Sequence, residues 1–297
     1  MQPTSLERLD TPDEDFLDIH HLSGPDDAPV LILLHGLEGG IRSHYIQGLL
    51  GEAKLRGWRA AVVIFRSCGG EMNRTRRSYH SGETSDLALV VDHLSNRFPS
   101  SPLLLTGTSL GGNVLLKYLG EQGSNLNPRV RAAVAVSVPF DLARASRHIG
   151  QGFARVYQKN FLRSLHRKAR LKLARYPDLV ETARLRGART MFDFDDVFTA
   201  PVHGFSGAED YYSRSSSLLW LERIRIKTLL LSAIDDPFLP AQVLREVREV
   251  AARNSHLHIE FTSHGGHVGS VAGSNPLRPT YYLEQRAGDF LAREIPD

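Results

Sequence analysis

Short apolar runs alternate with amphipathic stretches along most of this chain. Apolar or alternating runs predict β-strands near residues 30–35, 60–65, 102–106, 130–136, 228–233 and 257–262. Apolar positions that recur every three or four residues predict helices over 43–56, 82–98, 110–120, 241–253 and 278–293. This alternation is typical of an α/β fold whose central sheet is mostly parallel and covered by helices on both faces. A further strand near 15–22 is expected at an antiparallel edge.

One region interrupts the alternation. About ninety residues separate the strand that ends near Phe140 from the strand that begins near Thr228, too many for one crossover helix. We therefore expect an insertion over approximately 141–215, within a single domain that spans 1–297. Eight apolar residues, irregularly spaced, are candidates for its inner side: Phe153, Val156, Tyr157, Phe161, Leu162, Leu165, Leu171 and Leu173.

The first half of this insertion is strongly basic. Residues 141–189 carry thirteen Lys or Arg and three Asp or Glu, although the whole chain has a formal net charge of only +3. A solvated helical face is the simplest interpretation. Attraction of anionic substrates, or transient contact with an acidic lipid surface, is the functional alternative. No recognition helix, zinc motif or RNA-binding motif accompanies the charge, so no nucleic-acid partner is expected.

Composition indicates an ordinary soluble protein. The chain has 297 residues, of which 41% are hydrophobic and 23% charged, and it contains no apolar run of membrane-spanning length. Its first residues lack the charged head and apolar stretch of a signal peptide. Cys68 is the only cysteine, so an intrachain disulfide is impossible. We therefore expect a cytoplasmic protein, while its oligomeric state is left open.

The most informative stretch is PLLLTGTSLGGNVLLKY, residues 102–118. It reads as a buried strand, a Gly-x-Ser-x-Gly turn and an amphipathic helix that begins at once, which is the sequence context of a nucleophile elbow. Ser109 would occupy the sharp bend with its hydroxyl projecting above the sheet. Gly107 and Gly111 would let the strand and helix pack closely. The alternative is a simple strand-to-helix turn without chemistry.

A serine nucleophile needs an oxyanion hole. The apolar strand within residues 28–40 ends at His35 and Gly36, and the loop after it is suited to supply one amide. Leu37 N–H, together with Leu110 N–H just after the serine, are the candidate donors. Alternatively, this stretch is an ordinary strand-ending turn in which His35 is a hydrogen-bonded structural residue.

An acid is expected at the end of the strand within residues 227–240, because catalytic groups in α/β sheets gather at the carboxyl ends of the strands. Asp236, immediately before Pro237, is favoured over Asp235, which would cap the turn or hold the loop. Both aspartates could instead only cap the next helix. Asp141 is the fallback acid.

The base is expected in the glycine-rich loop that follows the last predicted strand. His267 is favoured over His264, because two glycines precede it and provide the loop needed to reach the serine. The chain order Ser109, Asp236, His267 is the order of one class of serine hydrolases. Two alternatives remain: surface histidines without a chemical role, and a metal site formed by His256, His258, His264 and His267.

These motifs together resemble a known family. HGLEGG (35–40), FRSCGGEMNRTRRSYHSGETSDL (65–87), GTSLGGN (107–113), DDPF (235–238), HGGHVG (264–269) and YYLEQRAGDFL (281–291) resemble the α/β-hydrolase superfamily, and more narrowly the YheT-like hydrolases of the AB-hydrolase-4 group. The resemblance implies an α/β-hydrolase fold in which the insertion is a helical lid. It also implies that Ser109, Asp236 and His267 form a catalytic triad, which cleaves carboxylic esters through an acyl-enzyme.

The expected substrate is a small-molecule acyl ester, and no cofactor or metal is expected. Two alternative functions remain. An acyltransferase would use the same triad with another acceptor, and a non-catalytic scaffold would bind an acidic partner through the basic insertion.

Overall fold

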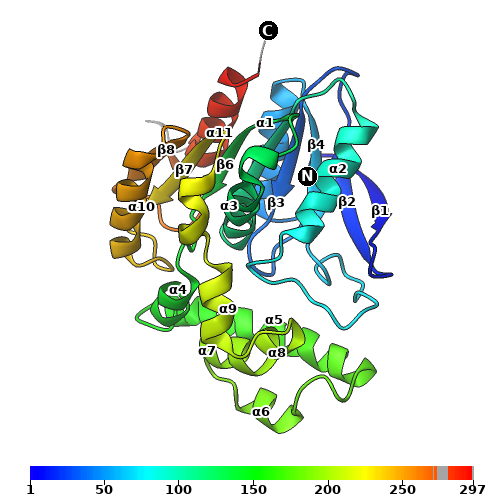
Figure 1. The fold of residues 1–297 in the computed structure, drawn as a ribbon, viewed down its shortest axis with the longest axis vertical. Helices are drawn as coiled ribbons and strands as arrows, with labels where there is room; N and C mark the ends of the chain where they lie inside the picture. The colour runs from blue at the N-terminus through cyan, green and yellow to red at the C-terminus, as the bar shows by residue number, and fades with distance from the viewer. Residues whose placement is uncertain (270, 273–279, 296–297) are drawn as a thin grey trace.

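The computed structural model describes residues 1–269, 271–272 and 280–295 (Figure 1). Its core is an eight-stranded sheet in the order β1-β2-β4-β3-β5-β6-β7-β8. In this order, the six strands β4, β3, β5, β6, β7 and β8 are parallel to one another. β1 and β2 are antiparallel to their neighbours. The bounds are β1 (Ser5–Asp10), β2 (Phe16–Leu22), β3 (Val30–Leu34), β4 (Arg59–Ile64), β5 (Leu103–Thr108), β6 (Val130–Val136), β7 (Lys227–Ala233) and β8 (Leu257–Thr262). The mostly parallel sheet of the sequence prediction is confirmed.

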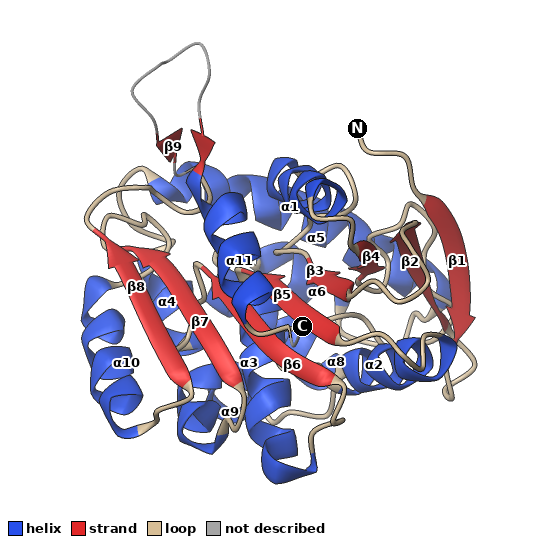
Figure 2. Cartoon of the chain, turned by 90° about the horizontal axis from the view of Figure 1, so that it is seen from above, coloured by secondary structure: helices blue, strands red, loops and turns tan. Residues whose placement is uncertain are grey.

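Helices cover both faces of this sheet (Figure 2). Successive residues of a strand point to opposite faces, so Val30 and Ile32 enter one core while Leu31 and Leu33 enter the other. The first core is completed by α2 (Ser85–Arg97), α3 (Leu110–Gln122) and α10 (Ala241–Arg253). The second is completed by α1 (His44–Leu55) and α11 (Tyr282–Arg293). Burial on both faces explains why the central strands are mostly apolar, as in the VLILL sequence of β3.

The strand that we expected at the antiparallel edge lies one position inside the sheet. The strand expected near 15–22 is β2, and β1 pairs with it to form the actual edge. The sequence of β1, SLERLD, gives little hydrophobic signal because Leu6 is 59% exposed and the other positions are polar or half-buried. An edge strand rich in charge is a common way to prevent association between sheets.

The chain between β6 and β7 contains the predicted insertion, here called the helical insertion (residues 142–215). Figure 1 shows its helices gathered at one end of the molecule, opposite the C-terminus. They are α4 (Leu142–His148), α5 (Ala154–Arg175), α6 (Thr182–Gly187), α7 (Met191–Phe194), the π-helical turn η2 (Asp195–Thr199), α8 (Ala200–Val202) and α9 (Ala208–Ser215). Short 3-10 helices lie at η1 (Gly123–Asn125) and η3 (Ser217–Arg223), and two short strands, β9 (Val271–Ala272) and β10 (Thr280–Tyr281), pair separately.

The eight apolar residues proposed for the inner side of the insertion divide into two groups. Leu162 and Leu173 are buried, and Phe161 and Leu165 are half-buried. The prediction is wrong for the other four, which are large exposed hydrophobic residues: Phe153, Val156, Tyr157 and Leu171. The spacing of large apolar residues did not predict the buried side of α5, because small residues such as Ala154 and Ala169 are also buried against the rest of the insertion.

Candidate active site

Each residue singled out from the sequence lies just after the carboxyl end of one of four parallel strands. Leu37 follows β3, Ser109 follows β5, Asp236 follows β7 and His267 follows β8. Because the carboxyl ends of parallel strands meet at one edge of the sheet, these segments converge there. Ser109, His267, Leu37 and Leu110 all line one cavity between the sheet and the helical insertion.

Ser109 occupies a strained turn. Its backbone has φ of 55° and ψ of −120°, a conformation that non-glycine residues rarely adopt. The turn is sharp enough that a Cβ atom on Gly107 would lie 2.4 Å from the carbonyl oxygen of Gly111. A Cβ on Gly111 would in turn lie 2.6 Å from the carbonyl oxygen of His35. Both glycines are therefore required by close backbone packing, which brings Ser109 beside the loop after β3.

His267 is paired with Asp236. The Nδ1 atom of His267 lies 2.7 Å from Oδ2 of Asp236, whose side chain is fully buried. The other oxygen of Asp236 accepts the amide N–H of Phe238 at 2.8 Å. This arrangement fixes the orientation of the imidazole through its Nδ1 atom.

The two competing acids have other partners. Asp235 accepts the amide N–H of Gly266 at 2.9 Å and lies 3.3 Å from the exposed His264, so it holds the loop that carries His267. Asp141 caps the start of α4 and binds the guanidinium of Arg144. The geometry thus joins Asp236, rather than Asp235 or Asp141, to the histidine.

Two further contacts hold His267, and neither was identified from the sequence. The hydroxyl of Ser137, which follows β6, donates to the carbonyl oxygen of His267. The ring of Phe238 lies 4.3 Å from the imidazole, centroid to centroid. Phe238 stands within the DDPF motif and could have been noted, whereas Ser137 carries no distinguishing pattern.

The loop after β3 is held on both sides of Leu37. The amide of Gly36 donates to the Tyr45 hydroxyl at 2.8 Å, and the amide of Glu38 donates to the Tyr79 hydroxyl at 3.0 Å. Leu110 is the first residue of α3, where amide groups have no partner within the helix. Leu37 and Leu110 both line the cavity that Ser109 also lines.

His35 has a structural role. Its buried ring donates from Nδ1 to the Gly36 carbonyl at 2.7 Å and accepts the Phe65 amide N–H on Nε2 at 3.1 Å. Burial lowers the pKa of His35 to about 4 and keeps the ring neutral. Both ring nitrogens are engaged with the backbone, so His35 shapes the loop and takes no part in proton transfer.

Glu38 connects this loop to the helical insertion. Its buried carboxylate accepts the Tyr79 hydroxyl at 2.6 Å and the Lys168 ammonium at 2.7 Å, and it also accepts the Ser164 hydroxyl. Burial by itself would raise the pKa of Glu38, but Lys168 and the hydroxyl donors bring it below its ordinary value. The sequence could not reveal this contact, because Glu38 and Lys168 are 130 residues apart.

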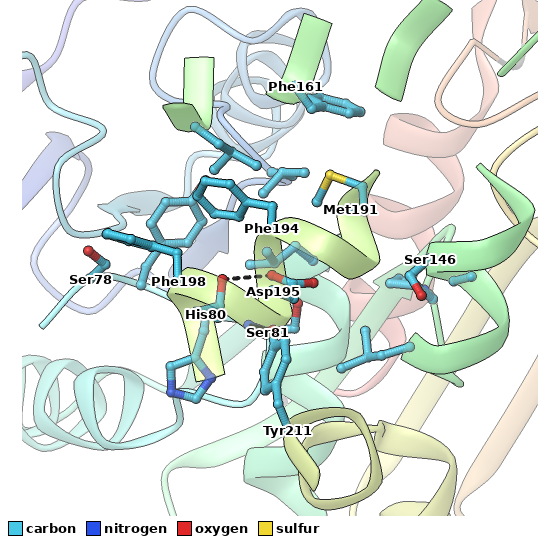
Figure 3. A pocket seen from close by; sticks show the side chains of 18 of the residues that line it. Ser78, His80, Ser81, Ser146, Phe161, Met191, Phe194, Asp195, Phe198 and Tyr211 are labelled. Atoms are coloured by element: carbon cyan, nitrogen blue, oxygen red, sulfur yellow. Dashed lines mark hydrogen bonds between the residues drawn. The ribbon is translucent and has the colours of Figure 1, made fainter. Parts of the chain in front are cut away.

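The cavity continues into the insertion with mixed chemistry. Apolar walls from Phe161, Met191 and Phe194 meet the polar groups of Asp195 and Ser146 (Figure 3). Asp195 is buried and accepts the hydroxyls of Thr199 and Tyr212 at 2.6 and 2.7 Å. Burial raises the pKa of Asp195 to about 6, despite these two hydrogen bonds.

The metal alternative gains no support from the geometry. Within the described residues, no three His, Cys, Asp or Glu side chains gather as a metal site would require. His264 and His267 bind different aspartates, as described above. Nor does any helix in the described part of the chain have the length and apolar character needed to cross a membrane.

Comparison with known proteins identifies the family of this chain. The sequence matches the family described as alpha/beta hydrolase fold over residues 29–271. It is 41% identical to the candidate esterase YheT of Escherichia coli (strain K12) over 290 residues, covering 96% of this chain and 84% of that protein. It is 32% identical to the monoacylglycerol lipase of Saccharomyces cerevisiae over 257 residues, covering 84% of this chain but only 56% of the yeast protein.

A solved structure shares the fold. The Pyrococcus furiosus esterase PF2001 superposes with a TM-score of 0.65 at 16% identity, covering 99% of this chain and 92% of that one. The sequence match spans most of the chain and includes the strands that carry Ser109 and Asp236. The resemblance inferred from the motifs is thereby confirmed: the chain is a YheT-like member of the α/β-hydrolase fold family.

Proposed function

We propose that this chain is a serine hydrolase of carboxylic esters, with Ser109 as the nucleophile, His267 as the base and Asp236 as the orienting acid. The observation that carries the proposal is the convergence of a strained serine and a histidine–carboxylate pair on one cavity. The names of the relatives, an esterase and a lipase, support the same reaction class.

The proposed reaction has two steps. Ser109 Oγ attacks the ester carbonyl carbon while its proton passes to Nε2 of His267, and the alcohol leaves with that proton to give an acyl-enzyme. Water, deprotonated by His267, then displaces the acyl group and restores Ser109. Amide groups of Leu37 and Leu110 would bind the oxyanion in both steps, and losing one such donor typically costs about 3 kcal/mol of barrier.

In this proposal the helical insertion acts as a lid within a single domain of residues 1–297. It supplies most of the apolar wall of the cavity, which suits the acyl part of a small-molecule ester. The basic charge of the insertion is consistent with contact with an acidic lipid surface. A cytoplasmic location stays a prediction from the sequence, based on the absence of a signal-like start and of a membrane-spanning apolar run, with the single cysteine in support.

Covalent labelling tests the proposal. A fluorophosphonate probe should label the wild type on Ser109, and Ser109→Ala should abolish both the label and the hydrolysis of a panel of esters of graded acyl length. Ser146→Ala is the matched control, because Ser146 lines the same cavity and should leave labelling intact. A folded wild type that is not labelled would contradict the proposal and favour a non-catalytic scaffold.

Product analysis in the presence of alcohol acceptors separates the two enzymatic alternatives. A hydrolase releases mainly the free acid, whereas an acyltransferase would form mainly a new ester.

A further inference from the structure

The outer side of α5 is a continuous cationic surface. This 22-residue helix contains eight Lys or Arg and no Asp or Glu. Lys159, Arg163, Arg167 and Arg170 recur at intervals of four, four and three residues, so they form one stripe along the helix, and all four are exposed. No acidic residue of α5 itself can neutralise this stripe.

A groove lies beside the stripe, between α5 and the segment that contains α6. Four arginines line it, Arg163 and Arg170 from α5 and Arg186 and Arg189 from the other wall, together with His166. Among the described residues that line the groove, none is acidic. None of the four guanidinium groups forms an ion pair with another described residue, in contrast to the paired Arg66 in the body of the protein.

The same helix borders the active-site cavity. Leu165, Lys168 and Ala169 of α5 line that cavity, while the arginine groove lies on the outer side of the helix. Figure 1 shows α5 and α6 at the end of the molecule farthest from the sheet. A ligand in the groove would therefore be separated from the cavity by only one helix.

Exposed apolar side chains accompany the charges. Phe153, Val156 and Leu171 are each more than half exposed, and Tyr157 is 42% exposed. The ring of Tyr157 lies 5.0 Å from that of Phe238, which packs on His267. The apolar residues at the start of α5 thus lead towards the candidate catalytic histidine.

We propose that the arginine groove and the cationic stripe bind the phosphate headgroups of an acidic phospholipid surface. Guanidinium groups match phosphate oxygens in charge and in bidentate geometry. A soluble phosphate would require only the arginines, whereas exposed aromatic and aliphatic side chains beside cations suit an interface of headgroups and acyl chains. Bound in this way, the insertion would face the bilayer with the start of α5 near the lipid.

Vesicle sedimentation tests this binding site. Vesicles of phosphatidylcholine alone are compared with vesicles in which part of the lipid is phosphatidylglycerol, at low salt and at physiological salt. The test variant is Arg163→Gln, Arg170→Gln and Arg186→Gln combined. The control variant combines Arg131→Gln, Arg245→Gln and Arg293→Gln, which removes the same charge from exposed arginines on β6, α10 and α11.

Wild type should bind the acidic vesicles and not the neutral ones. At about 1 kcal/mol for each cation near an acidic surface, the test variant should bind roughly a hundredfold more weakly, while the control should change by less than about threefold. Thermal unfolding verifies that both variants are folded. Ser109→Ala should bind as tightly as wild type, so failure of the catalytic proposal would not affect this result.

Three outcomes would overturn the inference. One is equal loss of binding in the test and control variants, which would mean that only net charge matters. Another is binding of inorganic phosphate as strong as that of vesicles, which would indicate a soluble ligand. The third is the absence of sedimentation with acidic vesicles at either salt concentration.

Discussion

Replacing Lys168 by Met would leave the carboxylate of Glu38 buried without its cationic partner. Methionine preserves much of the apolar stem of the lysine, so the change removes mainly the ammonium group. The side chains of Glu38 and Lys168 are only 8% and 16% exposed, which places this ion pair among the buried ones. Breaking such a pair from one side typically costs 3–5 kcal/mol. Because the hydroxyls of Tyr79 and Ser164 still donate to Glu38, we expect about 3 kcal/mol.

This cost depends on pH in a defined direction. The pKa of Glu38 lies below its ordinary value, so its stabilising effect is present above the unfolded pKa and is lost as the pH falls through the folded pKa. Without Lys168, burial is opposed less and the pKa of Glu38 rises. The stability difference between wild type and variant should therefore be largest near pH 7 to 8 and should narrow towards pH 4.

Thermal and chemical unfolding measure the effect. At about 2 °C for each kcal/mol in a chain of this size, Lys168→Met should lower Tm by about 6 °C at pH 7.5. Glu38→Gln combined with Lys168→Met should recover much of this loss, because the buried charge is gone. Strict additivity of the two single changes, or a double variant no more stable than Lys168→Met, would refute the reasoning.

Activity gives a second readout of the same contact, provided that the proposed hydrolase chemistry holds. Glu38 immediately follows Leu37, whose amide is a proposed oxyanion donor, so Glu38 and Lys168 are positioning residues for that amide. We expect Lys168→Met to lower kcat about tenfold, a part of the roughly 3 kcal/mol that one donor supplies, with a smaller change in KM. A change confined to KM would indicate that the contact shapes only the acyl pocket.

Two further predictions concern single residues of the site. Burial raises the pKa of Asp195 to about 6, so the native state holds an unfavourable buried charge above that pH and not below about pH 4. Asp195→Asn should therefore stabilise the protein by about 2 kcal/mol at pH 8 and leave its stability unchanged at pH 4. Equal effects on stability at both pH values would contradict this. Gly111→Ala should lower the free energy of unfolding by about 3 kcal/mol or more, because the added Cβ would meet backbone atoms of His35 and Leu34 at 2.6 and 2.7 Å. The control Gly187→Ala has open space around it and should be neutral or slightly stabilising in the same chemical unfolding measurement.

The elements that the sequence predicted best are those whose pattern is set by local burial. β3 to β7 are mostly apolar because both faces of the sheet are covered there, and β8 at the edge alternates apolar and polar residues. The helix starting at Leu110 follows directly from the glycine-serine turn. Asp236 and His267 could be chosen because strand ends in a parallel sheet converge at one edge. These inferences depend on short-range pattern together with one topological rule.

The features that sequence reasoning missed depend on packing between distant segments. β1 has a weak apolar signal because it is an edge strand with one neighbour. Glu38 and Lys168 each look like ordinary charged residues until α5 is placed against the loop after β3. Four exposed apolar residues of the insertion were expected inside, since irregular spacing does not show which side of a helix faces the core.

Cys68 gives the molecule a built-in chemical reporter. The residue is half-buried, its sulfur lies 3.1 Å from the ammonium of Lys168 on α5, and burial raises the pKa of the thiol, which lowers its reactivity. Any motion that carries α5 away from the sheet would remove this contact and expose the single thiol further. The rate at which an alkylating reagent reacts with Cys68 in the wild-type protein would then report how often the insertion moves away from the sheet. The measurement requires no label and no engineered cysteine.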